Sequence, residues 1–71
     1  MTAPSRDAAQ LMGLLRRSPL ICTACAAVKL ALAVERVLAA ASELTRSAAM
    51  EQTGGRCSVC GRTQAVMVLA K

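Results

Sequence analysis

The sequence predicts a small α+β domain in which three helices precede a C-terminal β-hairpin, and three observations support this class. Apolar residues recur at helical spacing as far as Arg46. Beyond Arg46, glycines and a short β-branched run indicate a hairpin. All four cysteines fall into two CxxC pairs, one before the longest helical stretch and one inside the expected hairpin. The cysteines therefore tie distant segments of the chain together.

The two pairs, Cys22 with Cys25 and Cys57 with Cys60, predict the chemistry that closes the hairpin. Two CxxC pairs, the second in a Cys-x-x-Cys-Gly turn, indicate a tetrahedral four-cysteine zinc site. Four thiolates leave no open coordination position, so we expect one structural Zn²⁺ per chain. An iron–sulfur centre is less favoured because the second pair lies in a ribbon-like glycine turn. A redox dithiol is less favoured still, because the βαβ setting of such motifs is absent.

The length and composition explain why a metal would matter. The chain has 71 residues and no Phe, Tyr or Trp, so Leu, Ile, Val and Met must supply the core. Zinc can contribute roughly 10 kcal/mol or more of apparent folding free energy to such a domain. We expect residues 1–5 to be a disordered lead and residues 6–71 to be one zinc-stabilised domain, folded with zinc and loosened without it.

The first helix is predicted from Arg6 to Arg17. Ser5 is a suitable N-cap, and Asp7 lies in the first turn, where the helix dipole favours a negative charge. Ser18-Pro19 ends the helix. One apolar face is formed by Ala8, Leu11, Met12 and Leu15.

Residues 24–46 contain neither glycine nor proline, and two architectures fit them. They form either one helix of roughly 30 Å or two helices separated by a tight turn at residues 31–33. A single helix would require the chain to return the same distance so that Cys57 meets Cys22, and eleven extended residues reach only about 36 Å. The geometry mildly favours two helices. The helical stripe consists of Leu30, Val34, Val37, Leu38, Ala41 and Leu44.

The C-terminal third predicts the hairpin itself. Gly54-Gly55 breaks any helix, and Gly61 suits the positive φ that a metal-binding turn requires. Residues 64–69 form a β-branched strand, whose natural partner is the segment at residues 49–56.

The charge and residue types exclude several functions. The formal net charge is +5, which four thiolates and one divalent cation would lower to +3, a value compatible with a nucleic-acid partner without proving one. Histidine is absent, so the usual general base is missing. The chain also lacks a glycine-rich phosphate loop. The acidic residues are scattered, and we expect neither an enzyme nor a small-molecule substrate: Asp7, Glu35, Glu43 and Glu51.

The apolar stretch at residues 20–44 is long enough to span a bilayer, yet it reads as a soluble helical core. It is rich in weakly hydrophobic alanine and contains four charged residues. The N-terminus lacks the pattern of a secretory signal. In a protein without such a signal, paired cysteines more often bind metal than form disulfides. We therefore expect a cytoplasmic protein that does not enter a membrane.

The run Cys22-x-x-Cys25-Ala26-x-x-x-Leu30, followed by Gly55-Arg56-Cys57-Ser-Val-Cys60-Gly61-Arg62, resembles small bacterial zinc-bound helix-turn-helix modules. In these modules a CxxC opens a helix, a second helix follows, and a Cys-x-x-Cys-Gly-Arg hairpin closes the domain. The resemblance covers about residues 20–68. The sequence departs at two positions: Ala31 stands where such modules carry the turn glycine, and Ala33 where they carry a Ser or Thr N-cap.

The resemblance implies a helix-turn-helix, winged-helix-like domain that binds double-stranded DNA or regulates transcription. Residues 34–46 would be the recognition-like helix. Its outward polar residues would be Arg36, Ser42 and Arg46, while Arg56 and Arg62 would flank the hairpin as phosphate contacts.

Two readings remain beside DNA binding. The arginines can be ordinary solvated side chains, since Ala39-Ala40-Ala41 offers little to read base edges and Glu35 would repel phosphate. Alternatively, the alanine- and leucine-rich surface of residues 24–46 packs against a protein partner or a second copy, giving a homodimer.

Overall fold

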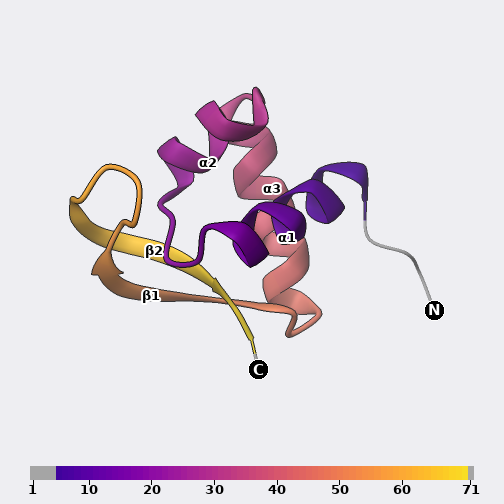
Figure 1. The fold of residues 1–71 in the computed structure, drawn as a ribbon. Helices are drawn as coiled ribbons and strands as arrows, with labels where there is room; N and C mark the ends of the chain where they lie inside the picture. The colour runs from indigo at the N-terminus through magenta and orange to yellow at the C-terminus, as the bar shows by residue number, and fades with distance from the viewer. Residues whose placement is uncertain (1–4, 71) are drawn as a thin grey trace.

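The computed structural model describes residues 5–70, in which three helices precede a two-stranded antiparallel sheet (Figure 1). This order confirms the predicted α+β class. Of the lead expected at residues 1–5, only Ser5 lies within the described residues. The helices are α1 (Arg6–Arg17), α2 (Thr23–Leu30) and α3 (Val34–Arg46), and the strands are β1 (Met50–Arg56) and β2 (Thr63–Leu69).

Helix α1 has the capping predicted from its sequence. The Ser5 hydroxyl oxygen accepts a hydrogen bond from the backbone N–H of Ala8 at 3.2 Å. Asp7 lies in the first turn and two arginines lie in the last, so both ends complement the helix dipole. The helix ends at Arg17, directly before Ser18.

The stretch at residues 24–46 forms two helices, because the chain reverses at Ala31. Ala31 adopts the left-handed conformation (φ 56°, ψ 42°), and the N–H of Leu32 donates to the carbonyl of Ala27 at 3.0 Å. This is the hydrogen bond of a Schellman cap, a position that usually belongs to glycine. Helix α3 starts without a side-chain cap at Ala33. No helix of residues 5–70 is long and apolar enough to cross a membrane.

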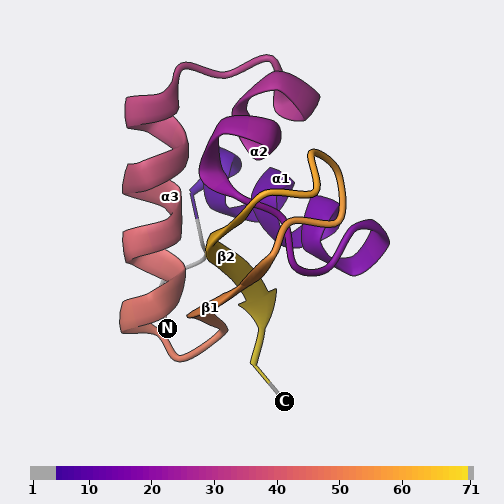
Figure 2. The same ribbon diagram turned by 90° about the vertical axis from the view of Figure 1, so that its left-hand side faces the viewer.

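The helices form one aliphatic core. Helix α3 stands along one side of the molecule, and α1 and α2 lie against it (Figure 2). The apolar stripes of α1 and α3 face each other, and methionines from the hairpin close the core. Its largest fully buried side chains are Leu11, Leu15, Ile21, Leu44, Met50, Met67, Val37, Val66 and Cys57.

The hairpin starts at the foot of α3 and runs toward α2 (Figure 2). Its register pairs Met50 with Leu69 and Arg56 with Thr63. The segment that connects α1 to α2 pairs with the other edge of β2 through an isolated antiparallel β-bridge between Ile21 and Met67. The N–H of Met67 donates to the carbonyl of Ile21 at 2.8 Å, and the N–H of Ile21 donates back at 3.3 Å. This bridge places the first CxxC pair beside the sheet.

Candidate metal centre

The second cysteine pair lies in the knuckle, the tight turn at residues 57–62 that joins β1 to β2. The N–H of Cys57 donates to the carbonyl of Arg62 at 2.9 Å, and the N–H of Gly61 donates to the carbonyl of Cys57 at 3.0 Å. Gly61 has φ 77°, a value that side chains disfavour. The positive φ predicted for this glycine is therefore confirmed.

The first cysteine pair opens α2. Cys22 is the N-cap residue and Cys25 lies in the first turn. The N-terminus of a helix favours negative charge, so thiolates are stabilised there. The Cys22 side chain makes no capping hydrogen bond to the backbone N–H groups of α2, and the neighbouring Thr23 is the first helical residue.

The segment before the first pair is fastened to the knuckle. The N–H of Ser58 donates to the carbonyl of Leu20 at 2.7 Å, and its hydroxyl donates to the carbonyl of Pro19 at 2.9 Å. Leu20 has φ 60°, the left-handed region. Together with the Ile21 bridge, these bonds hold the two cysteine-bearing segments side by side.

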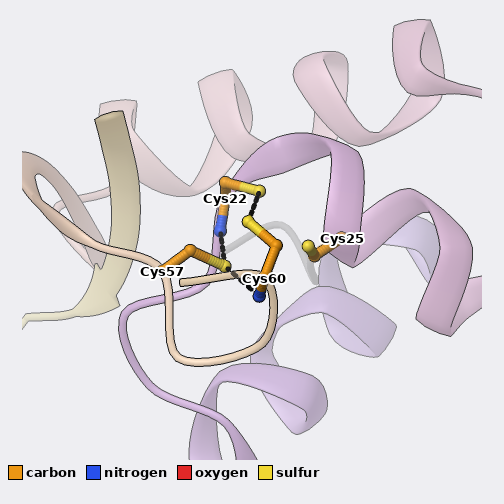
Figure 3. Close-up of side chains that lie close together, drawn as sticks. All are labelled: Cys22, Cys25, Cys57 and Cys60. Atoms are coloured by element: carbon orange, nitrogen blue, oxygen red, sulfur yellow. Dashed lines mark hydrogen bonds between the residues drawn. The ribbon is translucent and has the colours of Figure 1, made fainter. Parts of the chain in front are cut away.

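The four sulfur atoms gather at this junction (Figure 3). All four lie within 4.8 Å of one another, and the Sγ atoms of Cys22 and Cys60 are 3.9 Å apart. Four sulfurs bound at about 2.3 Å to one tetrahedral ion would be about 3.8 Å apart. A disulfide requires about 2 Å, and all four cysteines are free.

Backbone donors surround one of these sulfurs. The N–H groups of Cys22, Val59 and Cys60 lie 3.4, 3.4 and 3.5 Å from the Sγ atom of Cys57. Burial alone would raise the pKa of the Cys57 thiol, but the hydrogen bonds from Cys60, Cys22 and Val59 outweigh burial and lower it to about 6. Cys57 is thus ready to act as a thiolate.

Cys25 shows the opposite behaviour. Its hydrogen bond with the Cys22 side chain, together with burial and the neighbouring sulfurs, raises the pKa of Cys25 to about 12. Four thiols packed this closely cannot all be ionised unless a cation shares the site. The donor set and its spacing therefore fit one metal ion, and the four predicted metal ligands are positioned to hold it.

The five residues predicted to touch DNA are not gathered into one surface. Arg36 is bound to Asp7, with its Nη2 and Nε atoms 2.8 and 2.9 Å from the two carboxylate oxygens. Ser42 and Arg46 are exposed on α3 and line a shallow groove beside β1.

The other two lie at the far end of β1 from Arg46. Both are exposed, and Arg56 donates from Nε to the carbonyl of Gly61 at 3.0 Å, which holds it against the knuckle. Arg62 is the residue after Gly61 and is the last residue of the knuckle. The structure thus brings Arg56 and Arg62 together at the metal centre, and separates them from Arg46 by the length of the strand.

Two features of the structure do not follow from a local sequence pattern. The position of Asp7 predicts only a favourable contact with the helix dipole, yet Asp7 also joins α1 to α3 through Arg36. The other feature is a groove between α2 and the knuckle, lined by Val28 and Val59 among others. The Asp7–Arg36 pair spans 29 positions and is not encoded in any local pattern. The two CxxC motifs, in contrast, do imply that their flanking residues meet.

No protein family, curated protein or solved structure matches this chain. The resemblance to zinc-bound helix-turn-helix modules therefore rests on the cysteine framework and the order of the elements.

Proposed function

We propose that this chain is a zinc-dependent DNA-binding module of the helix-turn-helix type, in which zinc is structural and no reaction is catalysed. The observation that carries the proposal is the bend at Ala31. Three residues separate α2 from α3, the spacing at which a helix-turn-helix presents its second helix to the major groove. The hairpin that follows would act as the wing.

Zinc is the metal that suits this donor set. Thiolate ligands select soft or borderline ions, and a closed four-sulfur tetrahedron is a typical structural zinc site. Iron is the competitor, since it also takes four thiolates. Elemental analysis of the purified protein should give one zinc per chain. Iron absorption bands, or a metal-free folded protein with a disulfide, would contradict the assignment.

DNA contact would be mainly electrostatic. Arg46, Arg56 and Arg62 have exposed guanidinium groups at the two ends of β1, and such groups bind phosphates without reading sequence. Arg36 is less available, because Asp7 already neutralises it. The exposed face of α3 would bring Ser42 close to the bases, with little capacity for specific contacts.

The proposal is tested by fluorescence anisotropy with a short labelled DNA duplex and the zinc-loaded protein. Three phosphate contacts predict that the logarithm of the binding constant falls with the logarithm of salt concentration with a slope of about −2.7. Replacing Arg56 or Arg62 by Gln should reduce that slope by about 1 each. Arg6→Gln, at the exposed start of α1, is the matched control. Undetectable binding at low salt would dismiss DNA binding and leave the zinc assignment untouched.

A second candidate is association through α3 with another protein or a second copy. Val34 and Leu38 lie one helical turn apart and are 45% and 49% exposed. Burying them would gain roughly 1 kcal/mol or more each. A mass that rises with concentration in sedimentation, and returns to the monomer value in Leu38→Ser, would favour this candidate.

A further inference from the structure

A groove opens beside the metal centre, between α2 and the knuckle. Its volume is about 210 Å³, and its wall contains aliphatic side chains from both segments. Val28, on α2, is 81% exposed, and Val59, at the tip of the knuckle, is 45% exposed. The lining residues are Ala24, Cys25, Val28, Lys29 and Val59.

The metal centre assembles this groove. Val59 stands between Cys57 and Cys60, and Val28 lies one helical turn after Cys25. Figure 3 shows Cys25 on α2 directed toward the knuckle cysteines, so the cluster joins the two walls. An ion bound to all four sulfurs would fix the distance between the two valines, and loss of the ion would release it.

The charged side chains on α2 and at the two ends of the knuckle are all basic. Neither the chain between Asp7 and Glu35 nor the chain after Glu51 contains an acidic residue. Lys29 lies in the groove wall, and Arg56 and Arg62 stand at the two ends of the knuckle.

The cations remain in excess when the metal centre is included. Four thiolates with one divalent cation carry a net charge of −2. Lys29, Arg56 and Arg62 contribute three positive charges, so this end of the molecule keeps a charge of +1.

The volume and the charge of the groove limit the kinds of ligand that fit it. The groove is smaller than the about 300–1,000 Å³ of small-molecule sites, but has room for an aliphatic side chain. A second copy of the chain would bring one Lys29 against another. A phosphate backbone offers nothing apolar to cover the valines, and a flat bilayer does not enter a groove.

We propose that this groove binds an acidic segment of another protein, with an aliphatic side chain between Val28 and Val59 and flanking carboxylates against Lys29. The inference goes beyond DNA binding and does not depend on it. It uses α2 and the knuckle, whereas the helix-turn-helix proposal uses α3 and the hairpin, and the two proposals share only the hairpin end with Arg56 and Arg62.

The test is selection of a random 12-residue peptide display library on the immobilised, zinc-loaded full chain. The enriched peptides should contain an aliphatic residue flanked by Asp or Glu. Their synthetic forms should bind about tenfold more weakly to Val28→Ser and to Lys29→Glu. Leu38→Ser, which replaces a 49% exposed aliphatic side chain on α3, should bind as the parent does. Removing zinc with a chelator should abolish binding.

The same selection can overturn the inference. Peptides without acidic residues, no enrichment above blank resin, or binding that survives Val28→Ser would each reject it. Full displacement of the peptides by duplex DNA would assign the groove to nucleic acid, and displacement by phosphatidylserine vesicles would assign it to a membrane surface. DNA binding that fails while peptide binding persists would reject only the helix-turn-helix proposal.

Discussion

The helical end and the metal end of this molecule are stabilised by different interactions. At the helical end, α1 and α3 meet through buried aliphatic side chains, with Leu11 and Leu44 at most 2% exposed. At the metal end, the knuckle has most of its side chains in solvent, including Ser58 and Val59. Four sulfurs replace the missing hydrophobic contacts there.

This difference shows how a chain of 71 residues without aromatic side chains can specify one structure. The helical end needs a continuous apolar stripe, so its stability is spread over many residues. The metal end needs only two correctly spaced pairs, so with a metal ion bound its stability would be concentrated in four sulfur atoms and that ion.

The largest effect should come from removing the metal ion. We expect a chelator, or Cys57→Ser, to cost on the order of 10 kcal/mol of apparent stability, because the free energy of binding one ion at four thiolates becomes folding free energy in a domain of this size. Elemental analysis and far-ultraviolet circular dichroism, before and after chelation, measure the loss. Val59→Ser, in the same turn but not a ligand, should retain the metal and the signal. If the domain were equally stable without metal, the idea that a metal ion stabilises this end would be wrong.

The next largest effect should come from pH, which acts on the metal end. Zinc displaces protons from thiols. The folded knuckle lowers the pKa of Cys57 to about 6, so wherever this turn keeps its fold without metal, Cys57 is already deprotonated near neutral pH. Calorimetry in buffers of different ionisation enthalpy should therefore find one proton fewer released per zinc at about pH 7.5 than at about pH 5. An equal number at both pH values would contradict the depressed pKa.

The sign of the same shift predicts the behaviour of the metal-free fold. The pKa of Cys57 lies below the ordinary value of 9.0, so its thiolate stabilises the folded state fully above about pH 9. That contribution is lost as the pH falls through about 6. Acid should weaken the metal end before the helical end.

A smaller effect should follow a cavity at the helical end. Leu11→Ala removes a side chain that is fully buried in α1, and such substitutions cost about 2–5 kcal/mol. Urea unfolding of the zinc-loaded protein measures the cost. Leu38→Ala removes the same atoms from a half-exposed site on α3 and should cost much less. Zinc affinity should change little in either variant if the two ends are independent.

The same division explains what the sequence could predict. The metal ligands and the helical stretches follow local rules, such as CxxC spacing, the Ser5 cap and the apolar stripe that ends at Arg46. The predicted strand at residues 64–69 is confirmed within β2. These features depend on residues close together in the chain.

Other features depend on residues far apart and left no local pattern. Neither the Ile21–Met67 bridge nor the Asp7–Arg36 pair follows from periodicity. The sequence does not decide whether the chain bends at Ala31, because alanine disfavours the left-handed region and the usual glycine is absent. Tertiary packing of α2 and α3 on α1 outweighs a cost of about 1–2 kcal/mol there.

Ala31→Gly should therefore stabilise the protein. Ala31 has φ 56°, and glycine enters that region without a Cβ penalty, so we expect a gain of about 1 kcal/mol. Ala39→Gly is the matched control on the exposed face of α3, where glycine should cost about 1 kcal/mol. A rise in the free energy of unfolding in Ala31→Gly and a fall in Ala39→Gly, both measured with urea, would confirm that the bend is strained. A loss in both variants would indicate that α2 and α3 are continuous in solution.

The smallest effect should come from the ion pair between α1 and α3. Asp7 and Arg36 form two hydrogen bonds of 2.8 and 2.9 Å, but the arginine side chain is 59% exposed, so solvent and salt screen the pair. A double-mutant cycle with Asp7→Asn and Arg36→Gln should give a coupling free energy of about 0.5 kcal/mol. The cycle is needed because Asp7→Asn alone also removes a favourable charge from the start of α1.

The cycle also tests whether the two ends communicate. The pair joins α1 to α3 and touches neither the knuckle nor the start of α2, so zinc affinity measured by chelator competition should be the same in all four proteins of the cycle. If zinc affinity falls with the ion pair, then α1 positions the Leu20–Ser58 junction through its own orientation. The metal end would then depend on the helical packing as well as on its four sulfurs.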